Sequence, residues 1–194
     1  MNMHKVFTTK ICLLAFLFAW SGNCWGASQQ WRVAVYGMQF TETRFVEIVR
    51  SHTRFRASWA GAVAGSRLLR AWVNGRIGLE GEVQAAGHVG EQKHLEINAA
   101  LLLRGRLAVL PGELHLSMAH GLGPSIASST PRIERERHDE TSRRLVFMPS
   151  EISLGTPCRS REAFIRIHHR SGVFDLVSRG GGSNLVGAGF RWIW

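Results

Sequence analysis

The segment RIGLEGEVQA, residues Arg76–Ala85, alternates between two kinds of side chain along its whole length. Its odd-numbered positions, beginning with Ile77, are apolar or small, whereas its even-numbered positions are mostly polar and include Glu80 and Glu82. Successive side chains of a β-strand point to opposite faces, so a period of two predicts a strand with one apolar and one polar face.

The same alternation recurs on both sides of this segment. Residues 95–104 repeat it, and the C-terminal segment places five apolar residues on one face, ending with Trp192 and Trp194. We predict eight strands, near residues 31–39, 56–65, 73–85, 93–104, 113–123, 144–155, 162–172 and 184–194. An even number of strands about ten residues long, with a period of two, is typical of a transmembrane β-barrel of the outer-membrane type.

The predicted connections have the asymmetry that such barrels show. If the first strand begins in the periplasm, the periplasmic connections are short and read SRLLRAW, GRLAVLPG and GTPCRSR. Three of the other four are long, and the longest includes PRIERERHDETSRR. Short periplasmic turns and longer outer loops are expected for this fold.

A soluble β-sandwich is the alternative, because its strands alternate as well. The polar face argues against it, since it carries too many charges for a dry core, whereas the filled lumen of a narrow barrel can pair them. These inward residues are Arg76, Glu80, Glu82, Glu96, Glu151, Arg166, His168, Arg170 and Arg191. The predicted fold class is therefore all-β, an eight-stranded antiparallel transmembrane β-barrel.

The first residues resemble an export signal. Lys5 and Lys10 precede an apolar run over residues 11–20, and small residues follow at Gly26 and Ala27. About ten apolar residues are too few to span a bilayer, which favours a secretory signal peptide over a transmembrane helix. We expect two regions, a signal peptide over residues 1–26 and an outer-membrane barrel over residues 27–194.

The charge of the chain points to anionic partners. There are 24 Lys and Arg against 14 Asp and Glu, and loss of the two signal-peptide lysines leaves 22 − 14 = +8. Lys93 is then the only lysine, and arginine binds phosphate groups through two parallel hydrogen bonds. Export argues against nucleic acid as the partner and favours phosphorylated lipid at a cell surface. Cys158 would be the single remaining cysteine, so no internal disulfide is expected.

The seventh predicted strand carries a reactive-looking cluster, FIRIHHRSG, over residues 164–172. Alternation places His169 and Ser171 on the same face as Ile165 and Ile167, which should meet lipid, and Asn184 reaches the same wall from the next strand. A neutral imidazole near a serine can take its proton, and a third group can orient the imidazole.

The two adjacent histidines also have non-catalytic interpretations. A histidine and a serine two residues apart form a weak motif at a barrel rim, and His168 should point inward to pair with lumen carboxylates. No metal or cofactor is expected, because the remaining histidines lack the spacing of metal ligands. Those histidines are His88, His94, His115 and His120.

The final HHRSG, GGSN and GFRWIW motifs, the length, the signal and the eight-strand pattern resemble the PagL-type lipid A 3-O-deacylases, a group of acyloxyacyl hydrolase-like outer-membrane proteins. The earlier LEGEVQAAGHVGEQKHLEINAALLLR is similar to a central hairpin of that group. The resemblance implies hydrolysis of the ester-linked acyl chain at position 3 of lipid A by a serine, a histidine and a glutamate on the outer wall. It implies Ser171 as the nucleophile and His169 as the base.

The chain departs from this pattern at two places. Asn184 stands where the family has its glutamate, and Gly172 follows the serine where the family tends to have asparagine. The backbone N–H groups of Gly172 and Val173 are then candidate oxyanion donors. The sequence predicts an outer-membrane serine esterase with lipid A or lipopolysaccharide as substrate. A non-catalytic structural or lipopolysaccharide-binding barrel is the alternative, and a homodimer is left open.

Overall fold

The computed structural model describes residues 31–43, 45–48, 53–137, 140–156, 160–173, 176–178 and 181–194. The predicted signal peptide and Cys158 lie outside these ranges. The strands are β1 (Trp31–Thr41), β2 (Phe55–Trp72), β3 (Ile77–Gly90), β4 (His94–Leu110), β5 (Leu114–Ala127), β6 (Arg144–Gly155), β7 (Arg161–Ser171) and β8 (Gly182–Ile193). Three short helices connect some of them: α2 (Phe45–Ile48), η1 (Pro111–Glu113) and α3 (Arg132–Arg137).

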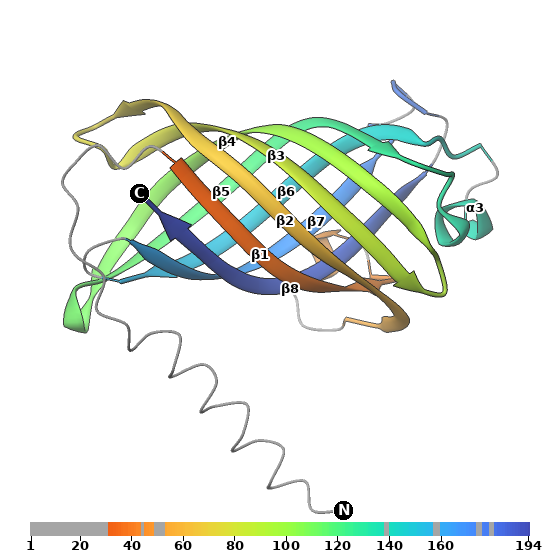
Figure 1. The fold of residues 1–194 in the computed structure, drawn as a ribbon, viewed down its shortest axis with the longest axis horizontal. Helices are drawn as coiled ribbons and strands as arrows, with labels where there is room; N and C mark the ends of the chain where they lie inside the picture. The colour runs from red at the N-terminus through yellow and green to blue at the C-terminus, as the bar shows by residue number, and fades with distance from the viewer. Residues whose placement is uncertain are drawn as a thin grey trace, which may run out of the picture.

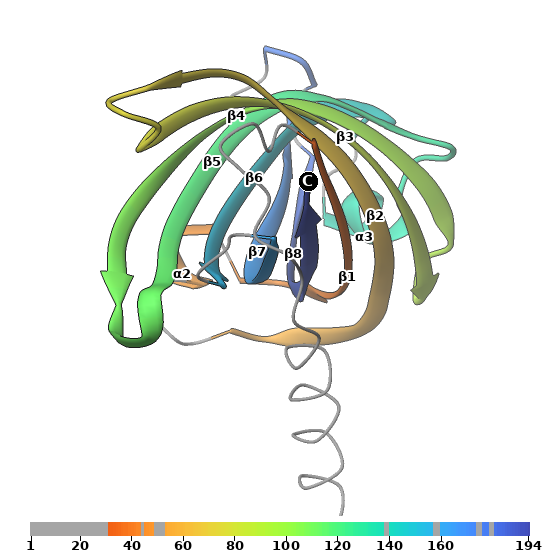
Figure 2. The same ribbon diagram turned by 60° about the vertical axis from the view of Figure 1, so that its left-hand side comes forward.

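The eight strands form a closed antiparallel barrel, which confirms the predicted fold class (Figures 1 and 2). Each strand pairs with the next in the chain, and β8 closes the ring by pairing with β1 from Arg32–Ile193 to Thr41–Asn184. Closure leaves no sheet edge with unpaired backbone groups. Among the described residues, no helix is long and apolar enough to cross a membrane.

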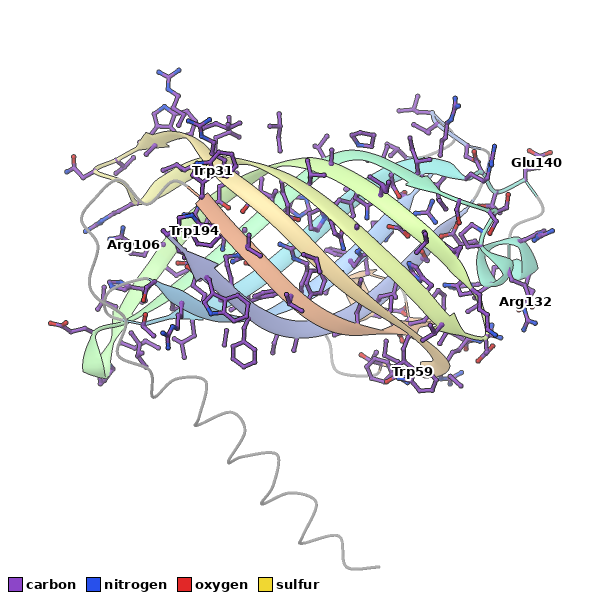
Figure 3. The ribbon with its side chains drawn as sticks, in the orientation of Figure 1. Trp31, Trp59, Arg106, Arg132, Glu140 and Trp194 are labelled. Carbon is purple, nitrogen blue, oxygen red and sulfur yellow. The ribbon has the colours of Figure 1, made fainter. Side chains whose placement is uncertain are left out.

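The two ends of the barrel differ as predicted. Trp31 and Trp194 lie at one end, here called the terminus end, and α3 lies at the opposite end, here called the α3 end (Figures 1 and 3). The connections at the terminus end are short, whereas three of the four at the α3 end are long. This is the expected asymmetry of an outer-membrane barrel.

Two predicted turns are wrong in position. SRLLRAW lies inside β2, and most of GRLAVLPG lies inside β4, because both hairpins continue to pair beyond the region of regular alternation. The register shifts between Leu68 and Arg70 and between Arg106 and Ala108. Such bulges interrupt the period of two. The alternation in the sequence therefore predicted that these two strands end earlier than they do. For the same reason Arg76, predicted to face inward, lies in the exposed turn before β3.

The exterior of the barrel wall is apolar, whereas its inner face carries buried charged side chains together with two clusters of apolar ones. Large apolar side chains such as Val63, Leu95 and Ile165 are 53%, 66% and 61% exposed on the exterior, whereas Glu151 and Arg166 are buried in the lumen. Tryptophans lie near both ends, with Trp31 and Trp194 at one and Trp59 at the other (Figure 3). An apolar exterior band between aromatic residues is the arrangement expected of a barrel surrounded by lipid.

The lumen is held together around the carboxylate of Glu151 on β6. Its oxygens accept hydrogen bonds from Arg104 on β4 at 2.9 Å, from Arg166 on β7 at 2.7 Å and from Arg191 on β8 at 2.6 Å. Arg166 also forms a bidentate pair with Glu82 on β3, at 2.6 and 2.9 Å. This network links five strands through charge-assisted hydrogen bonds, which are the stronger kind.

The charges of this central layer balance. The carboxylates of Glu80, Glu82, Glu151 and Glu162 face four arginines, which are Arg32, Arg104, Arg166 and Arg191. Buried charges are tolerated when they are paired and hydrogen-bonded. Paired charges therefore stabilise the lumen, together with the apolar side chains buried there.

Helix α3 closes the lumen at the α3 end. Ile133 and Glu134 are both buried. One carboxylate oxygen of Glu134 accepts hydrogen bonds from Arg170 on β7 at 2.9 Å and from Ser183 on β8 at 2.7 Å. The long β5–β6 connection is thus tied to the two strands that carry His169 and Asn184.

Replacing Glu151 by glutamine should destabilise the barrel strongly. Glu151→Gln leaves three buried arginines facing an uncharged amide, and breaking a buried ion pair costs about 3–5 kcal/mol. Urea unfolding of the protein in lipid vesicles, followed by tryptophan fluorescence, measures the change. Glu113→Gln, in an exposed turn at the terminus end, is the control and should change the stability by less than about 0.5 kcal/mol. Equal stability of the two variants would show that the network is not required.

Candidate site on the outer wall

His169 and Asn184 form a hydrogen-bonded pair on the exterior of the barrel. They lie directly opposite each other in the β7–β8 register, and His169 Nδ1 is 2.6 Å from Asn184 Oδ1. The inward neighbours of His169 are His168 and Arg170, both buried in the lumen, which leaves His169 on the outer face. The histidine is half-buried there and the asparagine is 8% exposed.

The second partner of Asn184 decides the direction of this hydrogen bond. Its Nδ2 group donates to the backbone carbonyl of Thr43 at 2.9 Å, so its Oδ1 atom faces His169 as an acceptor. His169 therefore donates through Nδ1–H and keeps Nε2 as its basic nitrogen. A carboxylate at position 184 would accept from the imidazole equally well, but it could not donate to Thr43.

The β1–β2 connection covers the pair. Thr41 Oγ1 donates to Arg54 O at 2.9 Å and accepts from Thr43 N at 3.1 Å, and Arg54 N donates to Thr43 Oγ1 at 2.9 Å. The Phe45 ring of α2 lies 5.6 Å from the His169 ring, measured between centroids. These contacts shield the imidazole and the amide from their surroundings on one side.

Ser171 ends β7 on the same outer face as His169, as predicted, and is half-buried. Its Oγ atom accepts a hydrogen bond from Val173 N at 3.0 Å. Within the part of the chain that the structure describes, Ser171 and His169 share no hydrogen bond. The serine is thus two residues from the imidazole on one face, with its hydroxyl oxygen turned to the following turn.

The predicted oxyanion donors are not free. The N–H of Gly172 donates to Gly181 O at 3.3 Å, and the N–H of Val173 donates to Ser171 itself. Val173 has a φ of 52°, an unusual left-handed conformation for a β-branched residue. Strained backbone of this kind is often found at functional sites.

An apolar groove lies on the same outer wall, nearer to the terminus end than the site. It has a volume of about 500 Å³, and its outward residues include Gly37, Trp59, Ile165 and Ala188. Gly37 pairs with Ala188, which pairs with Ile165, so two small residues lie beside a larger apolar one in the groove. Ile165 lies four residues from His169 on β7, about 13 Å at roughly 3.3 Å per residue. The groove therefore begins within a few residues of the imidazole.

The structure also shows pairs that the sequence did not reveal. His120 Nδ1 lies 2.7 Å from Ser150 Oγ, on the exterior of neighbouring strands β5 and β6. His88 and His94, given no role from their spacing, are directly paired across β3 and β4. Only the strand register brings these residues together. His168 is inside and bonded to Glu96 at 2.8 Å, which confirms its predicted position.

Comparisons with known proteins support the fold and leave the chemistry open. No family model and no curated protein matches the sequence. A crystal structure of the outer membrane enzyme PagL matches with a TM-score of 0.62 and 12% identity, over 83% of this chain and 98% of that chain. A crystal structure of the outer membrane protein OprG from Pseudomonas aeruginosa matches with a TM-score of 0.40 and 7% identity, over 87% of this chain and 98% of that chain. The likeness to PagL shows that this chain has the fold of an eight-stranded outer-membrane β-barrel.

Proposed function

We propose that this chain is an outer-membrane serine esterase that hydrolyses the ester-linked acyl chain at position 3 of lipid A. The observation that carries the proposal is the bonded His169–Asn184 pair beside Ser171, on an apolar outer wall. The proposal places the α3 end, with its long connections, at the cell exterior. The site then lies at the level of the outer leaflet, where lipid A lies. A substrate that is itself lipid reaches such a site without a pocket in the lumen.

In the proposed reaction Ser171 Oγ attacks the ester carbonyl while His169 Nε2 takes its proton. The imidazolium then protonates the leaving sugar hydroxyl, and water hydrolyses the acyl-serine to release the fatty acid. Asn184 is a positioning residue, because it holds the Nδ1–H tautomer that keeps Nε2 basic. No step requires a metal or cofactor.

The Ser171–Val173 hydrogen bond suggests how one of the two candidate oxyanion donors, the Val173 N–H, is released. Ser171 Oγ must turn away from Val173 N to reach the imidazole, and that rotation frees the Val173 N–H. The freed donor then lies next to the nucleophile, where negative charge develops on the ester oxygen. The site is thus completed as the serine becomes reactive.

Ser171→Ala should abolish deacylation. The nucleophile is lost, and removal of a catalytic serine lowers kcat by several powers of ten, up to about 10⁶-fold in a serine protease. Mass spectrometry of lipid A incubated with the protein in detergent micelles detects loss of the position 3 chain. Ser150→Ala is the matched control, since this serine also lies on the outer wall beside a histidine, and it should leave the rate unchanged. Wild-type protein that leaves lipid A intact would favour the non-catalytic, lipopolysaccharide-binding alternative.

Asn184→Leu should lower kcat by about 10²–10⁴-fold with little change in KM, because the imidazole loses the partner that selects its tautomer. Asn184→Asp should retain at least the wild-type kcat, since a carboxylate accepts from Nδ1–H and also stabilises the imidazolium. The measurement is the initial rate of fatty-acid release at several lipid A concentrations. A Leu variant as fast as wild type would exclude a positioning role.

Filling the groove should change which acyl chains are cleaved. A Cβ atom at Gly37 meets no other atom within 4 Å, so Gly37→Leu projects into the groove without a clash in the barrel. We expect kcat/KM for long chains to fall by about 10–200-fold relative to short ones, the usual effect of removing space for a methylene group or more. Gly65→Leu is the control, because Gly65 is equally open and lies outside the groove. Unchanged chain preference in Gly37→Leu would place the acyl chain elsewhere.

A further inference from the structure

A second cluster of reactive side chains lies inside the barrel, apart from the site on the outer wall. His88 at the end of β3 and His94 at the start of β4 are paired across the hairpin, and Glu96 follows two residues later on the same face. All three side chains are buried, with exposed fractions of 2%, 1% and 0%. One ligand atom from each lies within 4.8 Å of the others.

The cluster contains polar atoms that the rest of the described chain does not satisfy. Both ring nitrogens of His88 and of His94, and Oε2 of Glu96, have no hydrogen-bond partner among the described residues. His88 Nε2 lies 3.2 Å and His94 Nε2 3.9 Å from that same oxygen. Buried polar groups are nearly always satisfied, so several orphaned atoms around one point indicate a missing partner.

The residue types in the cluster suit a cation as that partner. The two imidazole rings are stacked, with centroids 4.0 Å apart and planes at 14°, an arrangement that would be repulsive if both were protonated. Among the described residues, the carboxylates of Glu96 and Glu134 both contact Arg170, and Glu96 is also bonded to His168. His168 is bonded to Oε1 of Glu96, and Oε2 has no hydrogen bond among the described residues but lies 3.6 Å from Arg170 Nε. The cluster therefore brings two imidazole rings and one carboxylate oxygen to a single buried point.

We propose that His88, His94 and Glu96 bind a divalent transition-metal ion, with Zn²⁺ as the ion that fits best. Two imidazoles and one carboxylate are an established ligand set for Zn²⁺, whereas Mg²⁺ and Ca²⁺ prefer oxygen ligands alone. Zn–N and Zn–O bonds of roughly 2.0–2.1 Å place ligand atoms about 3.4 Å apart, close to the separations seen here. The two rings must turn out of their stacked arrangement so that both ring planes pass through the ion. A fourth position remains for water.

Neighbouring groups already hold the carboxylate ligand in place. Glu96 Oε1 accepts hydrogen bonds from Asn98 Nδ2 at 2.7 Å and from His168 Nε2 at 2.8 Å, which directs Oε2 toward the two histidines. Such supporting hydrogen bonds to metal ligands fix their orientation. The ion would join the β3–β4 hairpin at the α3 end to β7 through His168.

The test uses the full barrel without a histidine tag, folded in detergent under metal-free conditions and titrated with Zn²⁺ or Co²⁺. We expect one equivalent of Zn²⁺ by calorimetry and visible absorption bands of bound Co²⁺. His88→Gln with His94→Gln should weaken binding by at least about 100-fold, the upper range of loss seen when even supporting residues are removed. His120→Gln removes a histidine from the outer wall and should bind as wild type does.

Two further measurements separate loss of metal binding from loss of folding. The gel shift between heated and unheated samples reports whether each variant is a folded barrel. If the double variant does not fold, the Co²⁺ spectra of the wild type and of Glu96→Gln test the proposal instead. The absorption bands should be present in the wild type and lost in Glu96→Gln. Absence of stoichiometric binding by the folded wild type, or binding by a folded double variant as tight as that of the wild type, would overturn the proposal. Esterase activity is not a readout, so this proposal and the proposed function fail independently.

Discussion

The buried carboxylate of Glu151 is the interaction on which the arrangement of this barrel depends. It accepts hydrogen bonds from arginines on β4, β7 and β8, so the face of each strand that carries its arginine must point into the lumen. Because strand side chains alternate, the inward position of Arg166 places His169 outside, and the inward position of Arg191 places Asn184 outside. The polar lumen and the candidate site on the wall are therefore two consequences of a single register.

Asn184 is better understood through both of its partners than as a weakened carboxylate. Its amide accepts from His169 and donates to the Thr43 carbonyl, so it joins the imidazole to the connection that covers it. A glutamate or aspartate would give up the second contact. The departure from the family pattern thus coincides with a local structure that uses both ends of an amide, and the covering segment brings Phe45 next to the imidazole.

The lumen contains two layers of different electrostatic character. The central layer balances four arginines against four carboxylates, whereas in the described residues near α3 the carboxylates of Glu96 and Glu134 contact Arg170 and, for Glu96, histidines. His168 and Arg170 connect this second layer to β7 on either side of His169. Residues of the lumen network and of the outer-wall site thus alternate along one strand.

Sequence alone determined the fold class, the strand count and the inward or outward direction of Arg166, His168, His169 and Ser171, because a period of two is a local property of the backbone. It misplaced Arg76 and the ends of β2 and β4, because bulges interrupt that period. Tertiary structure alone decided which residues of different strands meet: His169 with Asn184, His120 with Ser150, and His88 with His94. It also showed that the N–H groups of Gly172 and Val173 are occupied. Alternation gives the face of a side chain, but cross-strand neighbours depend on the stagger between strands, and that is set by pairing across the whole closed ring.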